Sequence, residues 1–182
     1  MSRYRRLWSS GPVPSPTVSR RPADSAPEEL FSGELTSALA GARRRAARDA
    51  DRQVDTAHLL HSLLESDPGA WELIGADGSR AARLLGYLAQ RSIGYGLRWQ
   101  GSVEDSGALP AIPGARVPGW SPAAAAALER ALWRAHVRDA PRVEGVDLLA
   151  ALAEDGDCRA AEVLARVGVE VAVPAHGADP HV

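Results

Sequence analysis

The sequence contains no lysine and no asparagine, so all 21 of its basic residues are arginine. A phosphate-binding P-loop requires a lysine, and the absence of lysine excludes such a loop from this chain. There is one cysteine, Cys158, which excludes an intramolecular disulfide and suits a reducing compartment. The chain therefore lacks the residues for P-loop nucleotide binding and for an intramolecular disulfide, and its remaining features concern packing and binding.

Aromatic residues are also scarce, at 5%, although 45% of the chain is hydrophobic. Alanine and leucine dominate the hydrophobic part, which favours closely packed helices over sheets. A net charge of −2 provides no overall attraction to nucleic acid or to an anionic membrane. No apolar run has the length of a membrane-spanning helix, and no apolar segment of a secretory signal follows the N-terminal arginines. We therefore predict a cytoplasmic, all-α protein.

One stretch of the sequence occurs twice, with an offset of 89 residues. Between Phe31–Glu65 and Trp120–Glu154, 11 of 35 positions are identical without a gap, where the composition predicts about three or four by chance. The identical positions are Ser32, Ala38, Leu39, Ala42, Arg45, Ala46, Val54, Leu59, Leu60, Leu63 and Glu65. A repeated helical unit without evident catalytic residues indicates a binding surface.

The repeat defines the expected domain organisation. A glycine- and proline-rich linker separates the two copies, and the ends of the chain lack apolar periodicity. We expect one domain over residues 30–173, with four helices in the first repeat and three in the second. Its parts are a flexible basic, proline-rich tail (1–29), repeat one (30–91), the linker (92–119), repeat two (120–173) and a short tail (174–182).

Capping residues indicate where several helices begin and end. Ser32 and Ser121 each precede an alanine-rich helix, and Pro122 occupies the first helical position after Ser121. Asp55 is placed to cap the second helix of repeat one, and Gly75 to end the third.

Two other groups of residues have structural interpretations. The arginines between residues 43 and 48 are expected to form a solvated face, with Arg45 pairing with Asp49 along the helix. Trp71 and Trp133 are expected to pack in the interior, and Cys158 to be a small buried residue at a helix start.

The motifs resemble a known family. Val-Asp-Thr-Ala-His-Leu-Leu at residues 54–60 is similar to the Ile-Gly-Thr-Glu-His-Leu-Leu of the Clp repeat domain. The run over residues 156–169, Gly-Asp-Cys-Arg-Ala-Ala-Glu-Val-Leu-Ala-Arg-Val-Gly-Val, is similar to the family's Ala-Ala-x-Val-Leu-x-x-Leu-Gly-Val. This is the N-terminal domain of Clp/Hsp100 unfoldases, and the ClpC type looks nearest. The resemblance implies two pseudo-symmetric repeats packed as one Clp N-domain-like bundle, here expected to be freestanding, without the ATPase.

The resemblance also implies a binding site. Phe31, Ser32, Trp120 and Ser121 match positions that open each repeat, where the family's domain binds peptides and cyclic-peptide antibiotics. In ClpC-type domains a glutamate in each repeat holds the guanidinium of phosphoarginine. Those positions are Ala57 and Val146 here, and an apolar side chain cannot accept the guanidinium's hydrogen bonds. We therefore expect the fold without phosphoarginine recognition.

Metal and catalytic sites receive little support from the sequence. His58 and His61 are three residues apart on one helix and are able to share a metal, but Asp55 and His58 also fit a helix-capping arrangement. No serine lies in the Gly-x-Ser-x-Gly elbow of a hydrolase. The sequence predicts no metal, no cofactor and no catalytic residue.

The expected function is that of a non-catalytic binding protein. It would bind peptides, clients, adaptors or peptide-like antibiotics, acting as an adaptor for a ClpC-type ATPase or as a decoy that sequesters ligands directed at it. One alternative is a nucleic-acid-associated regulator that uses the basic tail and the arginines of residues 43–48. The other is a hydrolase.

Overall fold

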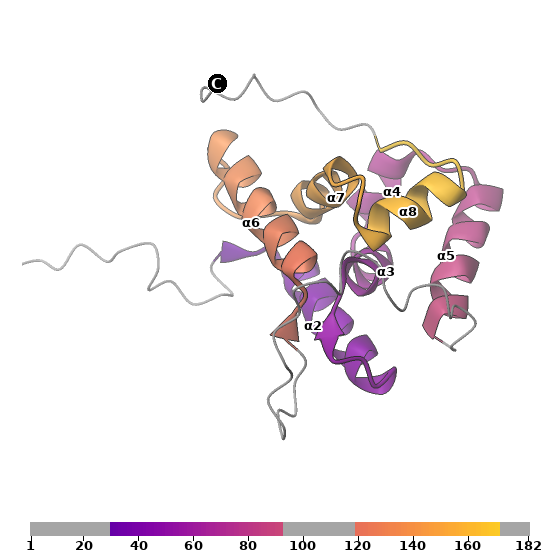
Figure 1. Cartoon of the computed structure of the whole chain (residues 1–182). Helices are drawn as coiled ribbons and strands as arrows, with labels where there is room; N and C mark the ends of the chain where they lie inside the picture. The colour runs from indigo at the N-terminus through magenta and orange to yellow at the C-terminus, as the bar shows by residue number, and fades with distance from the viewer. Residues whose placement is uncertain (1–29, 93–118, 172–182) are drawn as a thin grey trace, which may run out of the picture.

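Alanine- and leucine-rich segments, most of them preceded by a serine or aspartate, give the chain its seven described helices. A computed structural model describes residues 30–92 and 119–171 (Figure 1). The predicted tails and nearly all of the linker lie outside these residues. The helices are α2 (Gly33–Arg48), α3 (Thr56–Ser66), α4 (Pro68–Ile74), α5 (Gly78–Ser92), α6 (Pro122–Val137), α7 (Gly145–Glu154) and α8 (Arg159–Arg166).

The predicted division into four plus three helices is confirmed. The first repeat contributes α2 to α5 and the second α6 to α8, and the described residues after α8 form no further helix. The all-α prediction holds because the only strands in the described ranges are β1 (Gln53–Val54) and β2 (Gly119–Trp120).

The predicted caps are confirmed as well. The Ser32 hydroxyl accepts a hydrogen bond from the backbone N–H of Leu35, and the Ser121 hydroxyl accepts one from Ala124, both at 3.1 Å. Gly75 ends α4 with a φ of 57°, in the left-handed region that glycine enters without a steric penalty. The serine caps satisfy backbone N–H groups that a helix start leaves unpaired, each contributing about 0.5–2 kcal/mol.

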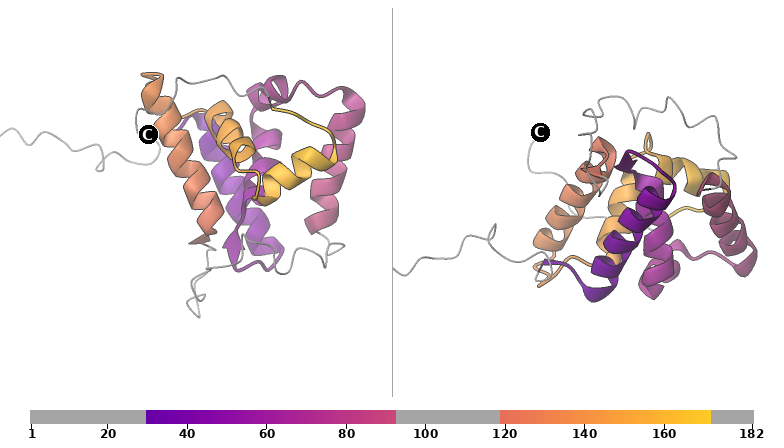
Figure 2. Two further views of the ribbon diagram at one scale, coloured as in Figure 1. Left: turned by 45° about the horizontal axis from the view of Figure 1, so that its top comes forward. Right: turned by 90° about the horizontal axis from the view of Figure 1, so that it is seen from below.

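The two repeats share one core because their helices are interleaved (Figures 1 and 2). Within the repeats, α2 packs on α3, and α6 packs on α7. Across them, α4 of the first repeat contacts α7 of the second, while α8 of the second contacts α3 of the first. Neither repeat therefore covers its second helix alone.

The short segment before the second helix of each repeat pairs with the opening of the other repeat. β1 pairs with β2 in parallel, with Val54 opposite Trp120, and an isolated parallel bridge joins Phe31 to Val143. The N–H of Ser121 donates to the Val54 carbonyl, and that of Ser32 donates to the Val143 carbonyl, both at 2.9 Å. Each repeat's opening is thus fixed to the other repeat.

Glycine at the start of α7 permits the closest approach between the repeats. A Cβ at Gly145 would lie 1.9 Å from a carboxylate oxygen of Asp67 and 2.7 Å from Cδ1 of Leu63. No side chain fits there without displacing these groups. A glycine is therefore needed where α7 meets the junction of α3 and α4.

None of the described helices combines the length and the apolar character that a bilayer crossing requires.

Candidate functional site

The opening of the second repeat forms a junction between α2 and α6. Trp120 is partly buried against the core, and the Arg43 guanidinium lies over its indole ring, 4.6 Å from the centroid. Such a cation–π contact contributes about 0.5–1 kcal/mol at an exposed site. Ser121 is 1% exposed, and its hydroxyl caps α6. At this junction Trp120 and Arg43, rather than Ser121, offer surface to a ligand.

The opening of the first repeat is the related junction. Phe31 and Ser32 are both partly buried, and Phe31 packs against the core. Their backbone is fixed to Val143, three residues before Val146. The structure therefore assembles each opening from both repeats, an arrangement that no single copy of the repeat reveals.

Ala57 and Val146, the positions where the resemblance places glutamates, differ in exposure. Ala57 is 1% exposed within α3, whereas Val146 is partly buried near the start of α7. Neither side chain has a hydrogen-bond acceptor. The guanidinium ligands that the resemblance places here are absent at both positions.

The expected solvated face of α2 is only partly present. Arg43, Arg44 and Arg48 are exposed, but Arg45 is partly buried and does not pair with Asp49 as predicted. It forms a salt bridge with Glu65 of α3, and its Nε donates to the Ser62 hydroxyl at 3.1 Å. The prediction was wrong because tertiary packing brings α3 alongside α2.

The Arg45–Glu65 pair has an equivalent in the second repeat. Arg134 of α6 forms a salt bridge with Glu154 of α7, and both residues follow their counterparts by 89 positions. The arginine and the glutamate are thus identical in the two copies, and in each copy they join the first helix of the repeat to the second. Arg134 is more deeply buried than Arg45.

His61 lies beside the Arg45–Glu65 pair, with Nε2 at 3.5 Å from Glu65. Burial, reinforced by Arg45, Arg48 and His58 and opposed by Glu65, lowers the pKa of His61 from 6.5 to about 4. Folding therefore favours the neutral imidazole.

This pKa predicts an acid-sensitive contribution to stability. The unfolded chain binds the His61 proton between about pH 6.5 and 4 and the folded chain does not, so stability falls as the pH falls through this window. We expect His61→Gln to remove that part of the pH dependence, measured by urea unfolding across the window. The exposed His136 provides a control variant, His136→Gln, and an unchanged slope in His61→Gln would contradict the prediction.

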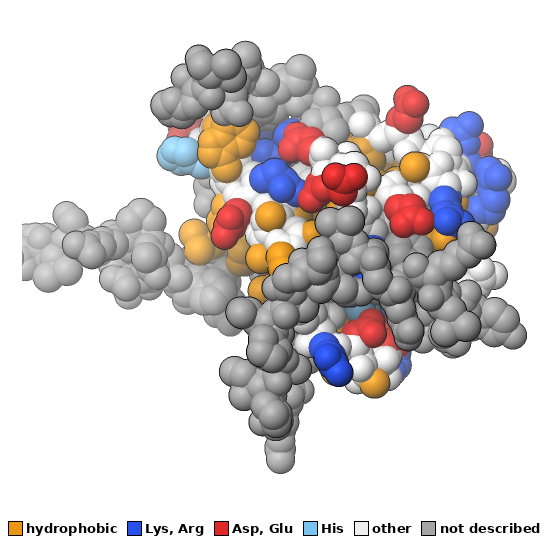
Figure 3. Space-filling view, in the orientation of Figure 1, with side chains coloured by type: hydrophobic (Ala, Val, Ile, Leu, Met, Phe, Trp, Pro, Cys, Tyr) orange, Lys and Arg blue, Asp and Glu red, His pale blue; other side chains and the backbone are white. Residues whose placement is uncertain are grey.

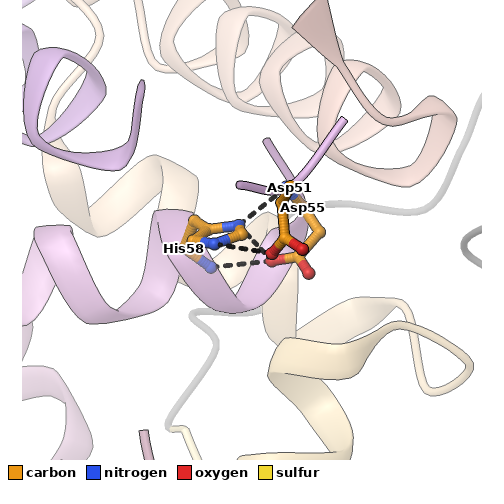
Figure 4. A group of neighbouring side chains, drawn as sticks. All are labelled: Asp51, Asp55 and His58. Carbon is orange, nitrogen blue, oxygen red and sulfur yellow. Dashed lines mark hydrogen bonds and ion pairs between the residues drawn. The ribbon is translucent and has the colours of Figure 1, made fainter. Parts of the chain in front are cut away.

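His58 and Asp55 form the predicted cap of α3. The His58 N–H donates to Asp55 Oδ1 at 2.9 Å, and the Asp55 N–H donates to His58 Nδ1 at 3.2 Å. His58 is also surrounded by acidic side chains, with Asp51 Oδ2 3.3 Å from Nε2 (Figure 4). The ligand atoms of Asp51, Asp55 and His58 all lie within 4.8 Å of one another. His58 thus groups with these aspartates rather than with His61.

Sequence reasoning missed the buried contact between α8 and α3. Arg159 Nη1 donates to Asp55 Oδ2 at 2.5 Å, and the Ala160 N–H donates to the Thr56 hydroxyl at 3.1 Å. Both bonds join residues 104 positions apart, so no local pattern signals them. They fix the start of α8 on the start of α3.

Trp71 and Cys158 pack into the core, whereas Trp133 lies on the surface. Trp71 packs against the core and donates its indole N–H to the Leu64 carbonyl at 2.7 Å, as expected of an interior residue. Cys158 is buried and caps α8. The interior prediction for Trp133 was wrong, because it is 46% exposed on α6. Leu132 and Val137 of the same helix are exposed as well. Figure 3 shows hydrophobic side chains on the surface over α6.

Comparison with known proteins identifies a related fold. No protein-family model and no curated protein matches the chain. A solved chain described as "Preliminary structural investigations of a malarial protein secretion system" superimposes with a TM-score of 0.54 and 19% identity. The match covers 75% of this chain and 84% of that chain. At this identity the likeness concerns the arrangement of helices alone.

Proposed function

We propose that this chain is a non-catalytic, Clp N-domain-like binding protein. Its ligands would be peptides, clients, adaptors or peptide-like antibiotics, bound at the junctions where one repeat opens against the other. The observation that carries this proposal is the reciprocal attachment of Trp120 to Val54 and of Phe31 to Val143. It creates two related junctions in one rigid core, each opened by an aromatic side chain.

The junction around Trp120 is the stronger of the two candidates. A partly buried indole supplies a large contact area that needs little ordering on binding, and the guanidinium of Arg43 adds a hydrogen-bond donor for a peptide carbonyl. Tryptophan and arginine are the residue types that most often dominate binding energy at interfaces. The lost acceptors at Ala57 and Val146 favour ligands other than phosphoarginine.

The proposal is tested by calorimetry with a cyclic peptide directed at ClpC. We expect measurable binding by the unaltered chain and a loss of at least tenfold in affinity for Trp120→Ala, because a central aromatic anchor contributes about 2 kcal/mol or more. Trp133→Ala is the matched control, since it removes an exposed indole from α6, the helix that follows Trp120 in the chain. Absence of both heat and thermal shift with the unaltered chain would refute the antibiotic-binding form of the proposal.

Two cellular roles follow from the same binding site. As an adaptor, the chain would deliver clients to a Clp ATPase, and it would be recovered with that ATPase in a pull-down. As a decoy, it would bind ligands that poison the ATPase and would protect the ATPase in a mixed assay. Failure of both experiments would exclude a role linked to Clp.

A further inference from the structure

The outward side of α6 is largely apolar, although no other described helix covers it. Within residues 30–92 and 119–171, the large hydrophobic side chains that are exposed all belong to this helix: Leu132 is 37% exposed, Trp133 46% and Val137 48%. α6 packs on α7 and lies along one edge of the bundle (Figures 1 and 2). A helix that is apolar on its outer as well as its inner side is normally buried. The outward side of α6 thus differs from an ordinary solvated helix face.

The equivalent helix of the first repeat has a polar outward side. α2 carries an exposed arginine 89 residues before each of the three hydrophobic residues of α6, at Arg43, Arg44 and Arg48. Both helices pack inward on the second helix of their own repeat, so they hold the same place in the fold. The fold therefore accepts charged side chains at these positions and does not need hydrophobic ones. Exposed apolar side chains that gather where folding does not require them indicate a contact with another surface.

Two polar side chains lie within the apolar side of α6. Helix geometry directs Glu129 and His136 to within about 60° of Trp133 around the helix axis. Both are exposed, and neither bonds to another side chain in the described part of the molecule. They are separated by about 10.5 Å along the helix, so they cannot pair with each other. A carboxylate accepts hydrogen bonds and an imidazole donates at least one in either protonation state, so the two groups are complementary.

A second copy of the helix, packed antiparallel, would satisfy both the apolar and the polar side chains. A twofold axis at the level between Leu132 and Trp133 brings Glu129 of each copy level with His136 of the other. The same axis brings the two Trp133 rings together on one side of the contact and the two Leu132 side chains together on the other. A twofold interface must be complementary to itself, and the order of residues along α6 meets that condition.

We propose that α6 is the contact surface of a twofold-symmetric dimer of this chain, in which the two α6 helices pack antiparallel. Leu132, Trp133 and Val137 form its apolar part, and the two Glu129–His136 pairs fix its register. The net charge of −2 on each chain opposes this association only weakly. Three large hydrophobic side chains from each copy make a small interface, so the dimer is weak and the chain is a monomer at low micromolar concentrations.

Analytical ultracentrifugation of the full-length chain from low to high micromolar concentrations tests the dimer. We expect the mass to move from that of one chain toward that of two as the concentration rises. Trp133→Glu is expected to weaken the association by at least tenfold, because it places a charge in the contact and removes the aromatic anchor. Arg44→Glu, at the equivalent exposed position of α2, is the matched control and should associate as the unaltered chain does. Circular dichroism should show both variants folded.

A charge exchange tests the antiparallel register. His136→Glu should weaken the dimer, because it sets two carboxylates opposite each other, and adding Glu129→His should restore most of the lost affinity, because the exchange re-forms both pairs. Failure of the double variant to recover would overturn the proposed register. The dimer itself is overturned if Trp133→Glu associates as tightly as the unaltered chain. It is equally overturned if the unaltered chain stays a monomer at every concentration, which would leave this side of α6 to another segment of the chain or to a different protein.

Discussion

Replacing Arg159 with alanine is expected to lower the free energy of unfolding by about 3–5 kcal/mol. Arg159 is 7% exposed and donates to Asp55, which is 3% exposed, so the substitution leaves a carboxylate buried without its guanidinium. The stability is lost because the Asp55 charge stays buried without a partner, not because the Arg159–Asp55 pair itself contributes that much. Urea unfolding followed by circular dichroism measures the change.

Arg166→Ala is the matched control, on the same helix. Arg166 is half exposed and pairs with the half-exposed Glu162, so its loss should cost about 1 kcal/mol or less. Adding Asp55→Asn to Arg159→Ala tests the cause, because the amide oxygen retains the cap of α3 while the charge is removed. We expect the double variant to be more stable than the sum of the single effects predicts. An additive result would show that the buried charge is not the source of the loss.

The fold was largely predictable because its signals are local. Serine caps, the proline after Ser121 and the glycine at 75 fix helix ends through backbone chemistry that a short segment contains. The helix α6 begins at Pro122, directly after its Ser121 cap, as the sequence predicted. The repeat offset also indicated which helices are equivalent. What the local signals could not reveal is that α4 and α8 each cross to the other repeat.

The candidate site was less predictable, because its contacts join distant residues. Asp55 was identified as a cap, but its buried partner Arg159 lies 104 residues away. Arg45 was assigned to solvent because helix periodicity places it among other arginines. The identity of both Arg45 and Glu65 between the copies was the available signal of their pairing, since a salt bridge common to both repeats keeps both partners. Trp133 was assigned to the interior from residue type alone, which cannot distinguish a core indole from one on an exposed helix face.

The interleaved core predicts that the two repeats unfold together. Leu59 of α3 and its equivalent Leu148 of α7 are both fully buried in one continuous core. Each change to alanine should cost about 2–5 kcal/mol, from lost burial and the cavity left behind. Because α8 covers α3 and α4 covers α7, damage in either repeat should shift the same single transition in urea.

Independent repeats would behave differently. Leu59→Ala would then lower one transition and leave a second unchanged, and Leu148→Ala would do the reverse. Leu132→Ala, at an exposed position of α6, serves as the control and should change stability by about 0.5 kcal/mol or less. A single transition displaced similarly by both buried leucines would mean that the junctions at Phe31 and Trp120 belong to one cooperative unit. Because each junction is built from both repeats, such a unit has no state in which one junction is intact while the other repeat is unfolded.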